Sequence, residues 1–322
     1  MKNLHRFLTA AILLLSLAAC NVPRVFPTPT ALPAALAATL TPFPAITLKP
    51  TQTPEPTSTI TPIPVWSADL LKNMTYTLPS YQETVTLVNG SYERTEAENT
   101  LRVNLLPQIV FGDLNGDGSL DAAVALAENG GGSGTFVSLV AVLNQNGTPI
   151  QSASVSIDDR PAIADILIQD GRIIVKATIH TVNDPFCCPT LEVVETYQLS
   201  SIPALDLVRF TSLTSDGRER AIHIESPAAG SEVQNTLQVS GSMPIGPFEN
   251  NLKYTIYDQK NTPLAVGPFP VSAANPGDPA TFSNNITIQD IAAGTHIRFE
   301  LIEESMADGS TLALDSVDLL VK

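Results

Sequence analysis

Residues 222–243 read IHIESPAAGSEVQNTLQVSGSM, and this stretch contains two strand-like runs separated by a turn. Apolar and polar side chains alternate on both sides of the Pro-Ala-Ala-Gly turn, and a period of two is typical of a half-buried strand. Further runs of this kind extend to the last residues. The chain from 221 to 322 therefore predicts seven short strands in a β-sandwich, at 221–225, 236–241, 252–257, 264–271, 281–288, 296–303 and 311–321.

The alternation also predicts which side chains form the core of this block. Leu252 and Ile256 share one face of their strand, as do Ile297 and Leu301 of another. In the last strand the apolar positions change parity between 314 and 317. An extra residue restores the inward face, so we expect a β-bulge near Asp315 and Ser316.

The spacing of the block resembles a known bacterial family. The matching elements are the pattern I.SP..GS.V...L.VSG from 222, the pair Phe248-Glu249 before the third strand, Phe282 in the fifth, and the Asp-Gly-Ser turn at 308–310. Together they are similar to the immunoglobulin-like domain of bacterial spore germination. The resemblance implies an adhesive or binding module and brings no catalytic residues with it.

The preceding block, residues 66–212, predicts a mostly antiparallel β domain. A short helix is expected at 67–73, capped by Ser67, and alternating runs follow it. The polar stretch SLTSDGRER at 212–220 marks the boundary between the blocks. Residues 70–200 also resemble a recurrent bacterial lipoprotein domain of undefined function, through elements such as LKNMTYTLP, the aspartate-rich loop, DDR and NDPFCCPT.

The aspartate-rich loop lies in FGDLNGDGSLDAAVAL, residues 111–126. Acidic, amide or hydroxyl side chains occupy alternate positions, which suits the oxygen shell that Ca²⁺ prefers; they are Asp113, Asn115, Asp117, Ser119 and Asp121. Val124 stands where an EF-hand has glutamate, and the flanks are strand-like. The loop resembles the D-x-N-x-D-G-x-x-D calcium loops of integrin-type repeats, so we expect a structural Ca²⁺; a metal-free Asn/Asp/Gly turn is the alternative.

Cys187 and Cys188 are adjacent in DPFCCPT. Neighbouring Cα atoms are about 3.8 Å apart, closer than relaxed disulfides prefer, yet an exported protein meets an oxidising compartment. A vicinal disulfide, two free thiols and a metal site therefore remain open alternatives.

The first twenty residues, MKNLHRFLTAAILLLSLAAC, combine Lys2 and Arg6 with a short apolar run, which is typical of a secretory signal. Leu17 to Cys20 resembles the bacterial lipobox, so Cys20 is expected to be lipidated and to hold the protein to a membrane. Residues 21–65 are rich in Pro and Thr and predict a disordered linker. The chain is therefore expected to be an exported, membrane-anchored lipoprotein on the extracytoplasmic side.

The chain carries a net charge of −15, which opposes binding to nucleic acid. His180, His223 and His296 stand singly in strand patterns, and we identify no catalytic motif. We therefore expect a mainly β, non-enzymatic envelope protein that binds a protein or cell-wall ligand. The alternatives are an envelope redox protein or hydrolase that uses residues 66–212, and a purely structural envelope component.

Overall fold

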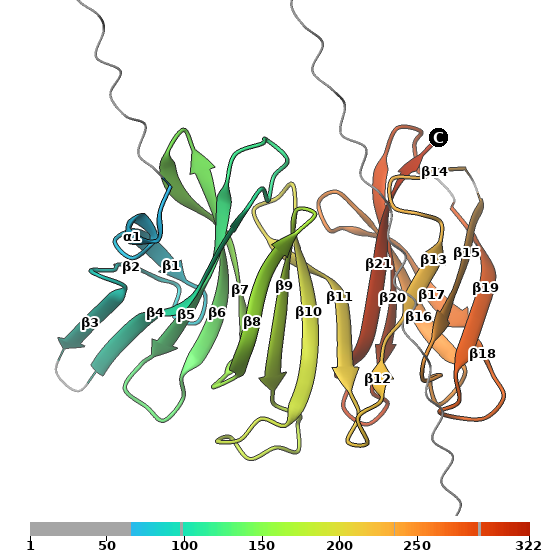
Figure 1. Ribbon diagram of the computed structural model, residues 1–322. Coiled ribbons are helices and arrows are strands. Elements are labelled where there is room, and N and C mark those ends of the chain that lie inside the picture. Colours follow the sequence, from blue (N-terminus) through green and yellow to red (C-terminus); the bar gives the residue numbers. More distant parts are fainter. Residues whose placement is uncertain (1–65, 97–98, 235, 289–290) are drawn as a thin grey trace, which may run out of the picture. The chain divides into compact units, whose positions relative to one another are not determined.

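The computed structural model describes residues 66–96, 99–234, 236–288 and 291–322. The expected signal peptide, the lipidated Cys20 and the linker at 21–65 lie outside the described residues. The described residues all belong to a single compact unit. The described part contains one short helix and is otherwise built of strands that pair antiparallel, as the sequence predicts, except for one short parallel pairing of Glu232–Val233 with residues 320–321 (Figure 1). None of its helices is long and apolar enough to cross a membrane.

Helix α1 (Ala68–Leu71) is shorter than the expected 67–73. Ser67 precedes it with an extended backbone, but the hydroxyl makes no capping hydrogen bond. The first turn closes instead through the backbone, where Leu70 N–H donates to the Ser67 carbonyl at 3.1 Å. Ser67 is therefore a boundary residue, and the expected side-chain cap is wrong.

The strands of the first half of the described chain belong to three sheets, of which one is small. A two-stranded sheet pairs β1 with β2, a five-stranded sheet has the order β3-β4-β5-β6-β7, and β8 to β11 are neighbours in a larger sheet. The bounds are β1 (Thr75–Leu78), β2 (Glu83–Thr86), β3 (Ser91–Glu96), β4 (Asn99–Gly112), β5 (Asp121–Asn129), β6 (Phe136–Gln145), β7 (Thr148–Asp159), β8 (Ala162–Gln169), β9 (Arg172–Ile179), β10 (Leu191–Leu199) and β11 (Leu205–Leu213).

Strand β5 is buried on both faces, which explains its nearly continuous apolar sequence AAVALA. Ala123 and Ala125 belong to a core shared with β8–β11, while Ala122, Val124 and Leu126 belong to a second core shared with α1, β1 and β2. A strand covered on both faces loses the alternation of a half-solvated one. Asp121 begins this strand, so the aspartate-rich loop is fixed to the most enclosed element of the domain.

The second half is the expected sandwich. One sheet has the order β13-β15-β19-β18, and the facing strands have the order β17-β16-β20-β21. The bounds are β12 (Glu219–Arg220), β13 (His223–Ser226), β14 (Glu232–Val233), β15 (Thr236–Met243), β16 (Asn251–Asp258), β17 (Pro263–Pro270), β18 (Ser272–Ala273), β19 (Ala280–Thr287), β20 (His296–Glu304) and β21 (Thr311–Val321). Each of the seven predicted ranges contains a strand, and Leu252, Ile256, Ile297 and Leu301 all lie in its core, as predicted.

The two halves share a sheet, because β11 pairs with β21. The sheet with the order β17-β16-β20-β21-β11-β10-β9-β8 therefore contains strands from both sides of the boundary that the sequence places at 212–220. Arg209 lies opposite Asp315 and Phe210 opposite Leu314 in this pairing.

The bulge expected near Asp315 and Ser316 is wrong, because these residues pair in regular register with Leu301 and Glu300. The register shifts instead at Glu303 and Glu304, where Leu312 is the extra residue. The change of parity has another cause. Leu314 packs into the core of the first half, whereas Ala313 and Val317 pack into the sandwich.

Candidate functional site

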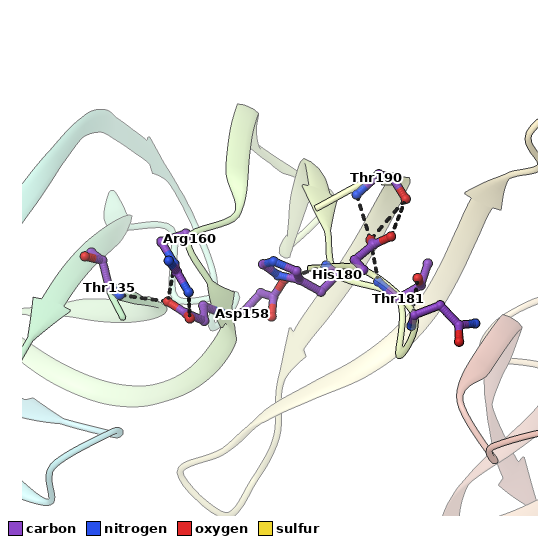
Figure 2. Close-up of polar contacts among 9 residues, drawn as sticks. Thr135, Asp158, Arg160, His180, Thr181 and Thr190 are labelled. Atoms are coloured by element: carbon purple, nitrogen blue, oxygen red, sulfur yellow. Dashed lines mark hydrogen bonds and ion pairs between the residues drawn. The ribbon is translucent and has the colours of Figure 1, made fainter. Parts of the chain in front are cut away.

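The ends of β7 and β9 bring Asp158 and His180 together (Figure 2). Asp158 Oδ2 accepts the backbone N–H of His180 at 2.6 Å and lies 2.8 Å from the ring Nδ1. The hydrogen bond to Asp158 raises the pKa of His180 above its ordinary value, since the carboxylate stabilises the imidazolium. Nε2 is buried and has no partner among the described residues. The pair fixes the start of the loop that connects β9 to β10.

Asp159, the next residue, makes an ion pair with its neighbour Arg160. Its Oδ2 lies 2.6 Å from Arg160 Nη2, and its Oδ1 accepts the backbone N–H of Thr135 at 2.7 Å. Burial opposes ionisation, but the contacts with Arg160 and Thr135 outweigh it and lower the pKa of Asp159. Arg160 adopts a positive φ of 53°, and its N–H donates to the Thr135 carbonyl, so the strand ends sharply here.

Asp184 stabilises the loop from 180 to 190 through hydrogen bonds with Thr181 and Thr190, which are labelled in Figure 2. Its Oδ2 accepts the backbone N–H groups of Thr181 and Thr190, each at 2.9 Å, and its Oδ1 accepts the Thr190 hydroxyl at 2.9 Å. The bond from Thr181 is the main cause of the lowered pKa of Asp184, since each donor favours the charged form. A single carboxylate thus joins the two ends of the loop.

The tip of this loop carries the adjacent cysteines. Cys187 and Cys188 form a disulfide across Cα atoms 3.7 Å apart, which is the first of the three alternatives left open by the sequence. Both cysteines are exposed, and Cys188 N–H donates to the Pro185 carbonyl at 2.9 Å. Phe186, immediately before them, is 83% exposed. The loop therefore holds a large apolar ring in solvent beside an accessible disulfide.

The aspartate-rich loop connects β4 to β5 and is ordered by hydrogen bonds from its own backbone. Asp113 Oδ1 accepts the N–H groups of Asn115 and Gly116 at 3.2 and 2.7 Å, and Oδ2 accepts that of Gly118 at 2.8 Å. Gly116 and Gly118 have φ values of 78° and 82°, a region that favours glycine.

The middle of the loop repeats this pattern. Asn115 Oδ1 accepts the N–H of Asp117 at 3.0 Å, and Asp117 Oδ1 accepts that of Ser119 at 2.7 Å. The bond from Ser119 is the main cause of the lowered pKa of Asp117. These are Asx turns, which also form without a metal ion.

Asp121 differs from the other residues of the loop because it is fully buried. Its Oδ2 accepts the N–H of Leu114 and its Oδ1 that of Asn144, both at 2.9 Å, so its side chain closes the loop and joins it to the end of β6. Burial is the main cause of its raised pKa, and the charges of Asp117 and Asp113 add to it. Across residues 66–322, the gaps aside, no three His, Cys, Asp or Glu side chains form a group that could hold a metal ion. Calcium binding stays a prediction.

Several structurally important residues are not identified by sequence reasoning. Asp158 and His180 are 22 residues apart, and only the ends of two strands bring them together. Glu195 and Tyr197 stand two apart on β10, a spacing that places both on one face, and Tyr197 donates its hydroxyl to Glu195 Oε2 at 3.0 Å inside the core. In the sequence, only their spacing of two residues within a strand indicates that their side chains can meet.

The comparison with protein families identifies the second half. Residues 221–310 match the family described as the immunoglobulin-like domain of bacterial spore germination, which confirms the predicted resemblance. No curated protein matches the chain. The match ends before β21, although that strand completes the sheet of the sandwich.

Proposed function

We propose that the chain is a non-catalytic, lipid-anchored binding or adhesion protein of the bacterial envelope. In this proposal Cys20 carries the lipid on the extracytoplasmic side and the Pro/Thr-rich linker separates the folded part from the membrane. The partner is a protein or a cell-wall ligand. The acidic net charge of −15 opposes a nucleic acid partner.

The observation that carries the proposal is the presence of large apolar side chains in solvent on hydrogen-bonded turns. Phe186, Phe248 and Met306 are 83%, 75% and 79% exposed. Aromatic side chains and methionine are enriched at protein interfaces, and an aromatic anchor contributes much of the binding energy when a partner covers it. Turns that are ordered before binding also reduce the entropy lost on association.

The immunoglobulin-like match supports this proposal at the level of architecture. A sandwich gathers its loops at the two ends of the sheets, where they are accessible to a partner. A fold does not determine a function, so the exposed side chains carry the argument.

Calcium at the aspartate-rich loop is part of the proposal, as a structural ion. The donor chemistry fits a hard cation, since a carboxylate retains lone pairs beyond the N–H bonds it accepts. Asp113, Asn115 and Asp117 would hold the ion with the help of Ser119. Asp121, whose two oxygens bind the Leu114 and Asn144 amides, fits less well and would mainly close the loop.

Sedimentation with purified cell walls and with washed envelope membranes tests the binding proposal. The full-length chain should sediment with one of these fractions, and the variant F186S/F248S/M306S should do so at least tenfold less. The matched control is V88S/L120S/V266S, which removes exposed apolar side chains elsewhere (66%, 57% and 57% exposed). A chain that stays in the supernatant with both fractions would contradict the proposal. For the anchor, Cys20→Ser should release the protein from membranes into the soluble fraction.

A second candidate function is thiol–disulfide exchange, favoured by the exposed Cys187–Cys188 bond. A thiolate of an external dithiol would attack one sulfur and form a mixed disulfide. Its second thiol would then release both cysteines as thiols and leave the dithiol oxidised. Oxidation of dithiothreitol by the wild-type chain, lost in C187S/C188S, would support this function. Equal rates for the two chains would exclude it.

A further inference from the structure

We propose that one end of the immunoglobulin-like half, formed by the turns at 244–250, 274–279 and 305–310, binds an arginine or lysine side chain that a partner protein presents between apolar residues. The inference rests on the proposed binding function and specifies its site and the chemistry of the partner. The three turns surround a groove of about 490 Å³, within the roughly 300–1,000 Å³ of ligand-binding clefts. We call it the end groove.

The first turn holds Phe248 at the edge of the end groove. Gly246 and Pro247 are buried, and Gly246 N–H donates to the Asp278 carbonyl at 2.8 Å. Asn250 has a φ of 52°; its N–H donates to the Pro247 carbonyl at 3.1 Å and its own carbonyl accepts the N–H of Val271 at 2.9 Å. The backbone is thus fixed on both sides of Phe248, whose ring is 75% exposed. Core packing does not explain this phenylalanine.

The other two turns are ordered in the same way. Met306, 79% exposed, lies in a turn closed by Ser305 N–H to the Ser310 carbonyl and by Gly309 N–H to the Ser305 carbonyl, both at 2.8 Å. In the third turn Asn275 Nδ2 donates to Asp278 Oδ2 at 2.7 Å. The end groove therefore has a preformed apolar rim.

Beneath this rim the groove is lined by Glu303, near the end of β20. Glu303 is only 5% exposed. Its Oε1 lies 2.6 Å from Arg220 Nη1, while its Oε2 is buried and has no partner among the described residues. A buried acceptor without a hydrogen bond is costly, and a charged donor that reaches it would recover this free energy.

The charge of the lining selects a cation. Three carboxylates, Glu249, Glu303 and Glu304, line the end groove together with a single basic residue, Arg220. Arg220 is already paired with Glu303, and Lys253 pairs with Glu304. Glu249 is the lining carboxylate outside these two pairs, and it is exposed at the rim. Guanidinium and ammonium groups carry apolar methylene stems that suit the Phe248 and Met306 rim. An acidic or purely apolar ligand would lack one of these two contacts.

Titration of the full-length chain, solubilised in detergent, with the peptide Ac-Leu-Arg-Leu-NH₂ tests the site. The matched probe replaces arginine with citrulline, which keeps the shape and removes the charge. We expect the citrulline peptide to bind at least tenfold more weakly. Chemical shifts should change first at the amides of Gly246 and Ala307, which line the groove.

Variants of the protein provide the second half of the test. F248S and M306S should each weaken binding of the arginine peptide at least fivefold without lowering the melting temperature. V266S, at an apolar residue of the same half that is 57% exposed and lies outside the end groove, is the matched control and should bind as the wild type does. E303Q should also weaken binding of the arginine peptide. Because this variant also changes the ion pair with Arg220, its melting temperature is measured as well: an unchanged melting temperature shows that weaker binding comes from the lost charge in the groove and not from a destabilised fold.

Two results would overturn the inference: failure of the arginine peptide to bind, or equal affinity for the arginine and citrulline peptides. Binding of a cell-wall amino sugar in place of the arginine peptide would also contradict it. If F248S and M306S sediment with the envelope fractions as the wild type does, the end groove is excluded and the binding function stands. Absence of sedimentation by the wild type contradicts the binding function itself.

Discussion

Glu195 is an ionisable group inside the core of the first half, where it is 6% exposed and accepts the Tyr197 hydroxyl. Burial raises the pKa of Glu195 to about 7, because the charged form loses its hydration; the bond from Tyr197 partly opposes this effect. The unfolded chain has a glutamate pKa near 4.5. Between these two values the folded state binds the proton more tightly than the unfolded state does.

The stability of the folded state should therefore fall as the pH rises from about 4.5 to about 7, and should then level off. The shift corresponds to a loss of up to about 3 kcal/mol. Glu195→Gln should remove this dependence, so that the variant matches the wild type near pH 4.5 and exceeds it at pH 8. Urea unfolding across this pH range measures the difference. Glu192→Gln, at an exposed position on the same strand, is the control; identical pH profiles for wild type and Glu195→Gln would disprove the assignment.

The sequence predicts residue roles well where local pattern decides them and poorly where distant strands meet. The Asp159–Arg160 pair follows from adjacency, and the inward faces of Leu252 and Ile256 follow from alternation. The contact between Asp158 and His180 depends on which strand ends lie together, and local pattern does not contain that information. Asp121 has a carboxylate suited to a cation, yet burial commits it to two backbone amides.

At the scale of elements, the aspartate-rich loop offers a direct test of calcium binding. If Asp113 holds the ion, addition of Ca²⁺ should raise the melting temperature of the full-length chain and chelation should reverse the rise. Asp113→Ala should remove this response. The variant also loses the three hydrogen bonds to loop amides, so its melting temperature should be lower with and without Ca²⁺.

Differential scanning calorimetry with Ca²⁺ and with a chelator measures both effects. Asp216→Ala, which changes an exposed aspartate in a separate turn, should keep the calcium response of the wild type. A wild-type chain with the same melting temperature in both conditions would show that the loop is an Asx-turn connection that needs no ion.

The positions of the strands were predictable because most of them have one face toward a core and one toward solvent. Strand β5 departs from that rule, yet its unbroken apolar run still marks it as a strand. The last strand departs in a different way. Its change of parity is visible in the sequence, but the expected bulge assumed a free outer face, whereas Leu314 packs into the other half.

At the scale of the whole molecule, Asp315 connects the two halves. It lies on β21 with its side chain 2% exposed, and its Oδ1 lies 2.9 Å from Arg209 Nε of β11. Its Oδ2 accepts the N–H of Ile224 on β13, also at 2.9 Å. One buried carboxylate thus joins a strand of the first half to two strands of the sandwich.

Asp315→Ala should lower the free energy of unfolding by about 3 kcal/mol, because Arg209 loses its partner and the Ile224 N–H is left without an acceptor. We also expect the wild type to unfold in a single calorimetric transition, and the transition of Asp315→Ala to broaden or separate into two, because the coupling between the halves weakens. Asp69→Ala, at a side chain 86% exposed, is the control and should do neither. An unchanged single transition in Asp315→Ala would show that the pairing of β11 with β21 does not depend on this carboxylate.

The pairing of β11 with β21 also affects how the protein tolerates being divided. The composition of residues 212–220 suggests a natural place to divide the chain. A cut there would expose an edge of β11 in one fragment and of β21 in the other, and the backbone N–H and C=O groups along these edges would lose their hydrogen-bond partners. Fragments 66–212 and 221–322, each expressed alone, should therefore self-associate, and more so at higher concentration. When the two fragments are mixed, they should associate with each other through the pairing of β11 with β21.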